Sequence, residues 1–198
     1  MPSVTLQVSA NWDDVYETET GGAITNGTRI QHDSATSGAG RRWGAHRWTG
    51  TLPRKGETIT TCYLSIYLYS ITVDDINGNI HFEKAASPAQ FSSTAFDVTD
   101  RTRTAASVSW VVNSLGTGWK NSPSLVTPMQ ELVDAHRPTA IVLIFRPNTN
   151  IGKQCVSYSY EEDSTWGAKL YIAWDADPLP TPGMAPAMTA KMVAGKLI

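Results

Sequence analysis

The stretch Ile59–Tyr69, with the sequence Ile-Thr-Thr-Cys-Tyr-Leu-Ser-Ile-Tyr-Leu-Tyr, decides the fold. One set of alternate positions is aliphatic or cysteine: Cys62, Leu64, Ile66 and Leu68. The positions between them are rich in tyrosine: Tyr63, Tyr67 and Tyr69. Because successive side chains of a β-strand point to opposite faces, this alternation predicts a strand with one aliphatic and one tyrosine-rich face. We expect the aliphatic face to pack against a second sheet and the tyrosine face to meet solvent or a partner.

Other parts of the chain repeat the strand pattern and show one helix signal. Alternating or apolar runs recur at residues 4–10, 41–48, 106–110, 139–145, 154–160 and 169–174. The run 139–145 is almost wholly apolar, which predicts a strand buried on both faces. Thr127, Pro128 and Gln130 are spaced as a helix cap, a first helical residue and a capping-box partner. About eight to ten short strands and one short helix predict an all-β fold, a two-sheet antiparallel β-sandwich of the jelly-roll type.

A turn rich in oxygen ligands is expected at residues 74–79. Its Asp and Asn side chains are of the kind that calcium prefers: Asp74, Asp75, Asn77 and Asn79. Turn formation alone also explains Asp, Asn and Gly at these positions, and the spacing is not that of an EF-hand. The pair Asp13-Asp14 offers two further carboxylates. Calcium is therefore the one metal worth testing, against the expectation that the protein holds no metal and no cofactor.

Composition narrows the classes of partner. The 198 residues include 16 basic and 18 acidic side chains, which gives a net charge of −2. Phosphate binding needs a concentrated basic surface, so nucleic acid is not the expected partner. No apolar stretch reaches the ~18 residues that a membrane span needs. The first residues, Met-Pro-Ser-Val-Thr-Leu, lack the basic and apolar regions of a signal peptide, which predicts synthesis in the cytoplasm without a membrane partner.

The sequence holds no recognisable catalytic motif. It has neither Gly-x-Ser-x-Gly nor a glycine-rich phosphate loop. The four histidines are dispersed and are expected on the surface or on strand faces: His32, His46, His81 and His136. Glycosidases need paired carboxylates, and Glu161-Glu162-Asp163 is better explained as a solvated turn. We therefore expect a protein that is not an enzyme.

The two cysteines, Cys62 and Cys155, both fall in expected strands. Two alternatives stay open for them. They are buried small side chains, or they form a disulfide between the sheets in an oxidising compartment. Zinc would need two more ligands, and no paired Cys or His spacing supplies them.

The composition changes after residue 174. We expect a jelly-roll domain over residues 1–174, followed by a proline-rich linker and an apolar tail over 175–198. A disordered terminus is one interpretation of the tail. The other is an anchor that binds a neighbouring subunit through its apolar residues: Met184, Met188, Met192, Val193, Leu197 and Ile198.

Several stretches together resemble a known family. They are Arg41-Arg42-Trp43, Leu52-Pro53-x-x-Gly56, Arg101–Trp110, Gly118-Trp119 and Lys169–Ile172. Over about residues 4–174 the chain is similar to a jelly-roll domain, like those of carbohydrate-binding modules, that is found in bacteriophage virion proteins and in large secreted microbial proteins. The shared motifs are structural, so they specify the fold better than the function.

The resemblance implies two functions. The first is a virion structural protein, such as a capsid decoration, minor capsid or tail-associated subunit. It would dock on the major capsid protein or on neighbouring copies through its termini, within a homo-oligomer or larger assembly of the virion. The alternative is a carbohydrate-binding module that recognises a glycan, for instance on a host surface, through exposed aromatics. The candidates for that role are Trp12, Trp48 and Trp166.

Overall fold

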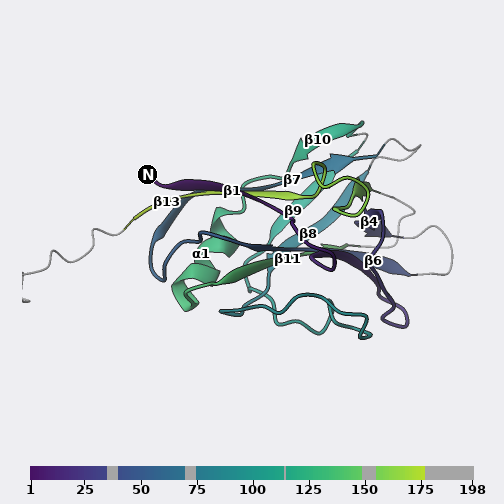
Figure 1. Ribbon diagram of the computed structural model, residues 1–198, viewed down its shortest axis with the longest axis horizontal. Coiled ribbons are helices and arrows are strands. Elements are labelled where there is room, and N and C mark those ends of the chain that lie inside the picture. Colours follow the sequence, from purple (N-terminus) through teal and green to yellow (C-terminus); the bar gives the residue numbers. More distant parts are fainter. Residues whose placement is uncertain (35–39, 70–74, 114, 149–154, 177–198) are drawn as a thin grey trace, which may run out of the picture.

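The computed structural model describes residues 1–34, 40–69, 75–113, 115–148 and 155–176. They form two antiparallel β-sheets that pack face to face, and the one helix among them is α1 (Val126–Ala135) (Figure 1). The predicted all-β sandwich is therefore confirmed. Within the described chain, no helix has the length and apolarity that a bilayer crossing demands.

The strands of both sheets come from distant parts of the chain. The six-stranded sheet has the order β1 (Ser3–Gln7), β13 (Lys169–Asp175), β7 (Thr58–Leu68), β12 (Val156–Tyr158) and β4 (Arg29–Gln31), and β10 (Gly118–Asn121) also pairs with β7. The seven-stranded sheet has the order β3 (Ile24–Thr25), β2 (Asp14–Thr18), β6 (Arg41–Thr49), β11 (Ala140–Pro147), β8 (Ile76–Phe82) and β9 (Val108–Val112), and β5 (Asp33–Ser34) also pairs with β6. Both central strands, β7 and β11, are those with the most regular apolar pattern in the sequence.

The main core lies between the two sheets. The aliphatic face of β7 is buried there, with Leu64, Ile66 and Leu68 each at most 1% exposed. Burial of such a side chain stabilises the fold by about 1.5–3 kcal/mol. Cys62 and Cys155 are both buried thiols, so the structure supports the first of the two alternatives for the cysteines.

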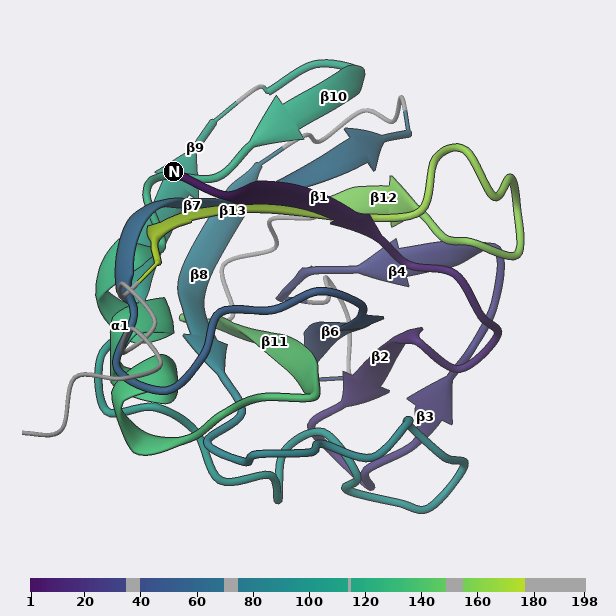
Figure 2. The ribbon, with the colours of Figure 1, turned by 60° about the vertical axis from the view of Figure 1, so that its left-hand side comes forward.

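Strand β11 is buried on both faces, as its apolar sequence predicts. Leu143 and Phe145 point into the main core, whereas Val142 and Ile144 belong to a second cluster on the other side of the same sheet. That second cluster is covered by the segment 84–107, which runs along the outside of the sheet near β2, β3 and β11 (Figure 2). Phe91 is 3% exposed and Val98 is fully buried, so this segment forms a third layer over the sandwich.

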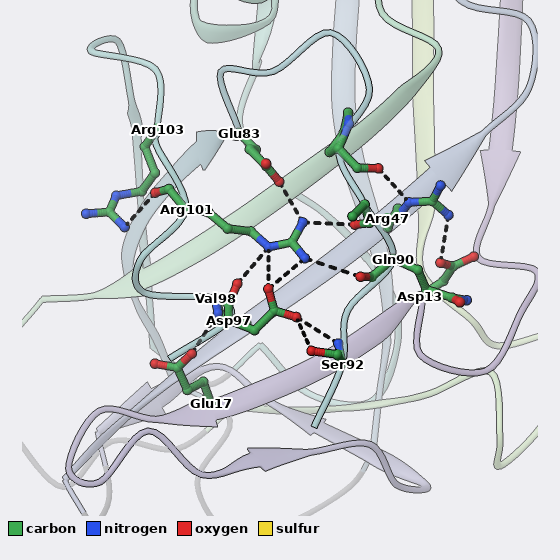
Figure 3. A network of polar contacts seen from close by, with 12 residues as sticks. Asp13, Glu17, Arg47, Glu83, Gln90, Ser92, Asp97, Val98, Arg101 and Arg103 are labelled. Carbon is green, nitrogen blue, oxygen red and sulfur yellow. Dashed lines mark hydrogen bonds and ion pairs between the residues drawn. The ribbon is translucent and has the colours of Figure 1, made fainter. Parts of the chain in front are cut away.

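A network of charges fixes the segment 84–107 to the sheet (Figure 3). The Arg101 guanidinium lies 2.7 Å from Glu83 Oε2 and 3.0 Å from Asp97 Oδ1, and it also donates to the Ala89 carbonyl. Glu17 on β2 accepts hydrogen bonds from the Val98 amide at 2.7 Å and the Thr99 hydroxyl at 2.5 Å. These buried polar partners explain why a polar segment can cover an apolar face.

Helix α1 begins two residues earlier than the expected first position. Leu125 is at the N-cap and its side chain makes no capping hydrogen bond, so the predicted capping box at Thr127 is wrong. Gln130 instead links the helix to β7, because its Oε1 accepts from the Ile59 amide at 2.8 Å and its Nε2 donates to the Glu57 carbonyl at 3.1 Å. Pro128 fits this start, since amides in the first helical turn need no helical partner.

The expected turn at residues 74–79 is a strand from Ile76 onward. Gly78 lies inside β8, where a Cβ atom would collide with the Phe145 ring and come within 2.6 Å of the Arg146 carbonyl oxygen. The glycine that suggests a turn is therefore required by a close approach of the neighbouring strand β11.

Candidate functional site

The tyrosine face of β7 lies on the outside of the six-stranded sheet. Tyr63, Tyr67 and Tyr69 are half-buried, whereas the side chains between them belong to the core. The two-residue period predicted from the sequence thus places the tyrosines where a partner can reach them.

Neighbouring strands add aromatic residues beside this face. Trp119 on β10 pairs directly with Tyr67 on β7, and Tyr158 comes from β12 on the other side of β7. Trp166 comes from the segment that precedes β13. We call the five rings of Tyr67, Tyr69, Trp119, Tyr158 and Trp166 the aromatic strip.

The rings of the aromatic strip contact one another continuously. Tyr67 stacks on Trp166 with centroids 5.2 Å apart and meets Trp119 edge to face at 5.4 Å. Tyr158 lies 4.6 Å from Trp166 and 5.2 Å from Tyr69. Each such pair contributes about 0.5–1.5 kcal/mol beyond simple burial, so the rings hold one another in place. A second stacked pair, Tyr63 and Tyr171, lies on the same two strands β7 and β13 with centroids 5.0 Å apart.

The segment that carries Trp166 is held by local hydrogen bonds. Asp163 Oδ1 accepts from the Thr165 amide at 2.8 Å and from its hydroxyl at 2.7 Å, which closes an Asx turn. These bonds lower the pKa of Asp163 below its ordinary value. The Trp166 amide donates to the Asp163 carbonyl at 2.9 Å, and Gln7 on β1 donates to the Ser164 carbonyl at 2.7 Å. Trp166 is therefore placed by the fold even though it lies outside a strand.

The aromatic strip offers both apolar faces and hydrogen-bonding groups. Trp119 is 38% exposed, and the other four rings are half-buried. Desolvation, together with the neighbouring Tyr69 and Glu162, raises the pKa of Tyr158, so its phenol is protonated at neutral pH and can donate a hydrogen bond.

Two cations rest on the rings of the aromatic strip. The Arg29 guanidinium carbon lies 3.7 Å from the Tyr69 ring centroid, and Lys169 Nζ lies 4.0 Å from that of Trp119. Both distances are within the ~6 Å range of cation–π attraction.

Only one of the three predicted sugar-binding tryptophans lies in the aromatic strip. Trp166 is there, but Trp48 is 1% exposed and its Nε1 donates to the Ala168 carbonyl at 3.0 Å. The prediction for Trp48 is therefore wrong: it belongs to the main core. Trp12 is half-buried against the second cluster, under the segment 84–107, and does not join the strip. Trp119 and the tyrosines are also among the aromatic residues that the sequence offers for sugar binding, but alternation along β10 and β12 would turn Trp119 and Tyr158 inward, and the structure places both on the outer face.

The residues of the calcium prediction make other contacts. Asn77 and Asn79 lie on β8, and both side-chain amides hydrogen-bond to that of Asn148, at 2.8 Å and 2.6 Å. Asp75 is buried at 5% exposure, and Asp74 lies outside the described residues. Among the residues with described positions, no group of three or more His, Cys, Asp or Glu side chains is arranged to hold a metal ion.

A buried polar cluster lies between the sheets beside β2, β6 and β12. Asp14 is fully buried, and its Oδ2 accepts from the Tyr160 amide at 2.9 Å. Burial raises the pKa of Asp14 to about 8, and the carboxylates of Glu161 and Asp13 add to the increase. Because Asp14 is inaccessible, the Asp14–Glu161 pair is not presented to a substrate in the way that glycosidase chemistry requires.

Two of the four histidines belong to the same buried polar cluster. His46 lies directly opposite Asp14 in the pairing of β2 with β6, and its ring centroid is 5.2 Å from that of His32. They are 0% and 1% exposed, so neither lies on the surface. His46 is on a strand face of β6, as one of the two expected positions has it, whereas His32 lies between β4 and β5. Burial lowers the pKa of His32 to about 3 and that of His46 well below 6.5. His32 is 3.0 Å from the Ser157 hydroxyl, whereas neither ring nitrogen of His46 has a hydrogen-bond partner in the described chain.

The expected anchor residues of the tail, Met184 to Ile198, lie outside the described residues. No protein-family model matches the chain, and no curated protein matches it. The resemblance to virion and carbohydrate-binding domains therefore stays a prediction.

Proposed function

We propose that this protein is a non-catalytic binding module that holds a saccharide against the aromatic strip. The observation that supports this most directly is the convergence of five aromatic rings from β7, β10, β12 and the segment before β13 on one outer sheet face. A pyranose ring presents C–H bonds with partial positive charge, and these are attracted to the negative face of an aromatic ring.

Preorganisation supports the same function. Tyr67 contacts Trp119, Tyr158 and Trp166, so little side-chain freedom remains to be lost on binding. The phenol hydroxyls at the rim would hydrogen-bond to sugar hydroxyls, and this combination of an apolar face with a few polar groups suits a ligand that has both.

The experiment compares matched aromatic variants on a glycan array, followed by calorimetric titration of any ligand found. Trp119→Ala should weaken binding by about 5- to 30-fold, because a stacked face worth roughly 1–2 kcal/mol is lost. Phe96→Ala is the matched control, since Phe96 is 39% exposed but lies on the segment 84–107 at the other sheet. A folded wild-type protein that binds no glycan, or a Trp119→Ala variant that binds as well as the wild type, would refute the proposal.

We also propose a structural role in a virion, in which the sandwich is a subunit that presents the aromatic strip. Its support is the resemblance over about residues 4–174 to domains of bacteriophage virion proteins. Deletion of residues 177–198 should then abolish incorporation into particles while the sandwich still unfolds cooperatively. Unchanged incorporation of the shortened protein would contradict the anchoring role of the tail.

A further inference from the structure

We propose that the saccharide held by the aromatic strip is anionic, and that Arg29 and Lys169 bind its carboxylate groups. This inference rests on the proposed saccharide-binding function. It goes further by naming the charge of the ligand and the two side chains that recognise that charge.

The two cations lie at opposite ends of one series of ring contacts. Lys169 rests on Trp119, which meets Tyr67. Tyr67 in turn contacts Tyr158, which meets Tyr69, and Arg29 rests on Tyr69. A chain of sugars that stacks along these rings would therefore meet a positive charge at each end.

Three of the eight other arginines of the described sandwich are paired with carboxylates. Carboxylates lie 2.5 Å from Arg41, 2.9 Å from Arg47 and 2.7 Å from Arg101. Arg29 and Lys169, in contrast, have no carboxylate within 4.0 Å in the part of the chain that is described. An arginine that contacts a ring and has no carboxylate partner can still donate its N–H groups to a planar, two-oxygen acceptor such as a carboxylate.

Two acidic residues near the aromatic strip must be considered as well. Asp163 accepts hydrogen bonds from the Thr165 amide and hydroxyl, which favour its charged form, so its negative charge opposes an anionic ligand. Glu162 is exposed and close enough to Tyr158 to raise the pKa of its phenol. Glu162 therefore opposes an anionic ligand, and its removal should strengthen binding.

The probes are carboxylated polysaccharides paired with neutral counterparts that have the same backbone. Polygalacturonate, alginate and hyaluronate are each compared with their carboxyl-reduced forms by affinity electrophoresis and calorimetry, with dextran sulfate as a sulfated probe. At least one carboxylated polymer should bind about tenfold or more tightly than its reduced form. That preference should shrink with added salt, because the cations are accessible to solvent.

Charge variants assign the effect to the two cations. Arg29→Gln and Lys169→Gln should each lower the affinity for the carboxylated polymer several-fold and leave the affinity for its reduced form unchanged. Glu162→Gln should raise the affinity for the carboxylated polymer. Lys55→Gln is the matched control, since it removes an exposed positive charge from the turn before β7 and should have no effect.

Each outcome separates the inference from the function on which it rests. Equal binding of the carboxylated and reduced polymers would overturn the anionic ligand but leave saccharide binding intact. Binding of dextran sulfate alone would overturn carboxylate recognition. Failure of the folded wild type to bind any charged or neutral polysaccharide would overturn the saccharide-binding function itself.

Discussion

The stability of this protein should fall as the pH rises from 6.5 to 8, and Asp14→Asn should remove that fall. Burial raises the pKa of Asp14 from 3.8 to about 8 in the folded state. Between these two values the unfolded chain has released a proton that the folded protein still holds. Each pH unit in that interval therefore removes about 1.4 kcal/mol of the contribution that Asp14 makes to the free energy of unfolding, and this loss is complete above about pH 8.

The buried histidines act in the opposite direction at lower pH. Burial lowers the pKa of His32 to about 3 and that of His46 well below 6.5. Below pH 6.5 the unfolded chain protonates these histidines and the folded protein does not, so their contribution to stability is lost as the pH falls. Two histidines outweigh one aspartate in that range, and the maximum of stability should therefore lie near pH 6.5. From there to pH 8 the contribution of Asp14 falls by about 1.7 kcal/mol. Over the same interval the histidines of the unfolded chain, which are half protonated at pH 6.5, release their remaining protons and return about 0.8 kcal/mol, so the net loss is about 1 kcal/mol.

The assay is urea unfolding monitored by tryptophan fluorescence at pH 5.5, 6.5, 7.5 and 8.5. Wild type should be about 1 kcal/mol less stable at pH 8.5 than at pH 6.5 with an unchanged m-value, whereas Asp14→Asn should show no loss and a gain of about 0.8 kcal/mol from the two histidines. The asparagine oxygen still accepts from the Tyr160 amide, so the variant keeps the hydrogen bond of the folded state. Asp100→Asn removes an exposed carboxylate and should follow the wild-type profile. Parallel profiles for wild type and Asp14→Asn above pH 6.5 would refute the assignment.

Four further substitutions test contacts that hold the sandwich together. Arg101→Met should destabilise the protein by about 1–3 kcal/mol in urea unfolding, because Glu83 and Asp97 would remain partly buried without their cation. Gly78→Ala should cost about 1–3 kcal/mol in the same assay, since its Cβ atom would collide with the facing strand β11. Thr127→Ala should change the stability by less than about 0.5 kcal/mol, whereas Gln130→Ala should cost about 1–3 kcal/mol because it leaves the Ile59 amide without its partner.

Each of these substitutions has its own control. Arg137→Met removes an exposed arginine and should be near neutral. Gly27→Ala places a Cβ atom 3.7 Å from the nearest atom, an ordinary contact, and should cost little. A larger loss for Thr127→Ala than for Gln130→Ala would mean that the helix is capped as its sequence suggests. Retention of native stability by Arg101→Met would show that the segment 84–107 is held without the ion pairs of Arg101.

The sequence predicts the central strands well because their pattern depends on burial alone. In β7 a two-residue period separates the core side chains from the tyrosines, and in β11 continuous apolar residues indicate burial on both faces. Both predictions are confirmed. They need no knowledge of which strand lies beside which, since any partner sheet produces the same alternation.

Local signals fail where a distant contact decides the conformation. Gly78 indicates a turn by composition, but it lies in a strand because the Phe145 ring occupies the space of its side chain. Thr127 and Gln130 have the spacing of a capping box. The side chain of Gln130 instead accepts a hydrogen bond from the Ile59 amide, 71 residues away. Phe91 and Val98 lie in a polar stretch, and only the Arg101 and Glu17 contacts turn it into a covering layer. Sequence spacing carries no information on any of these partners.

The aromatic strip depends on sheet order rather than on any motif, and this is why the sequence predicts only part of it. The tyrosines of β7 are predicted to face outward, but their neighbours Trp119 and Tyr158 join them because β10 and β12 both pair with β7. Exposed aromatic side chains lower the solubility of a protein, and a β-sandwich can bury aromatic residues in its core, as this one does with Trp48 and Trp110. Here the fold instead gathers rings from four chain segments on one outer face and fixes the last of them, Trp166, with an Asx turn. An arrangement that keeps apolar surface accessible while immobilising it has the properties of a binding surface.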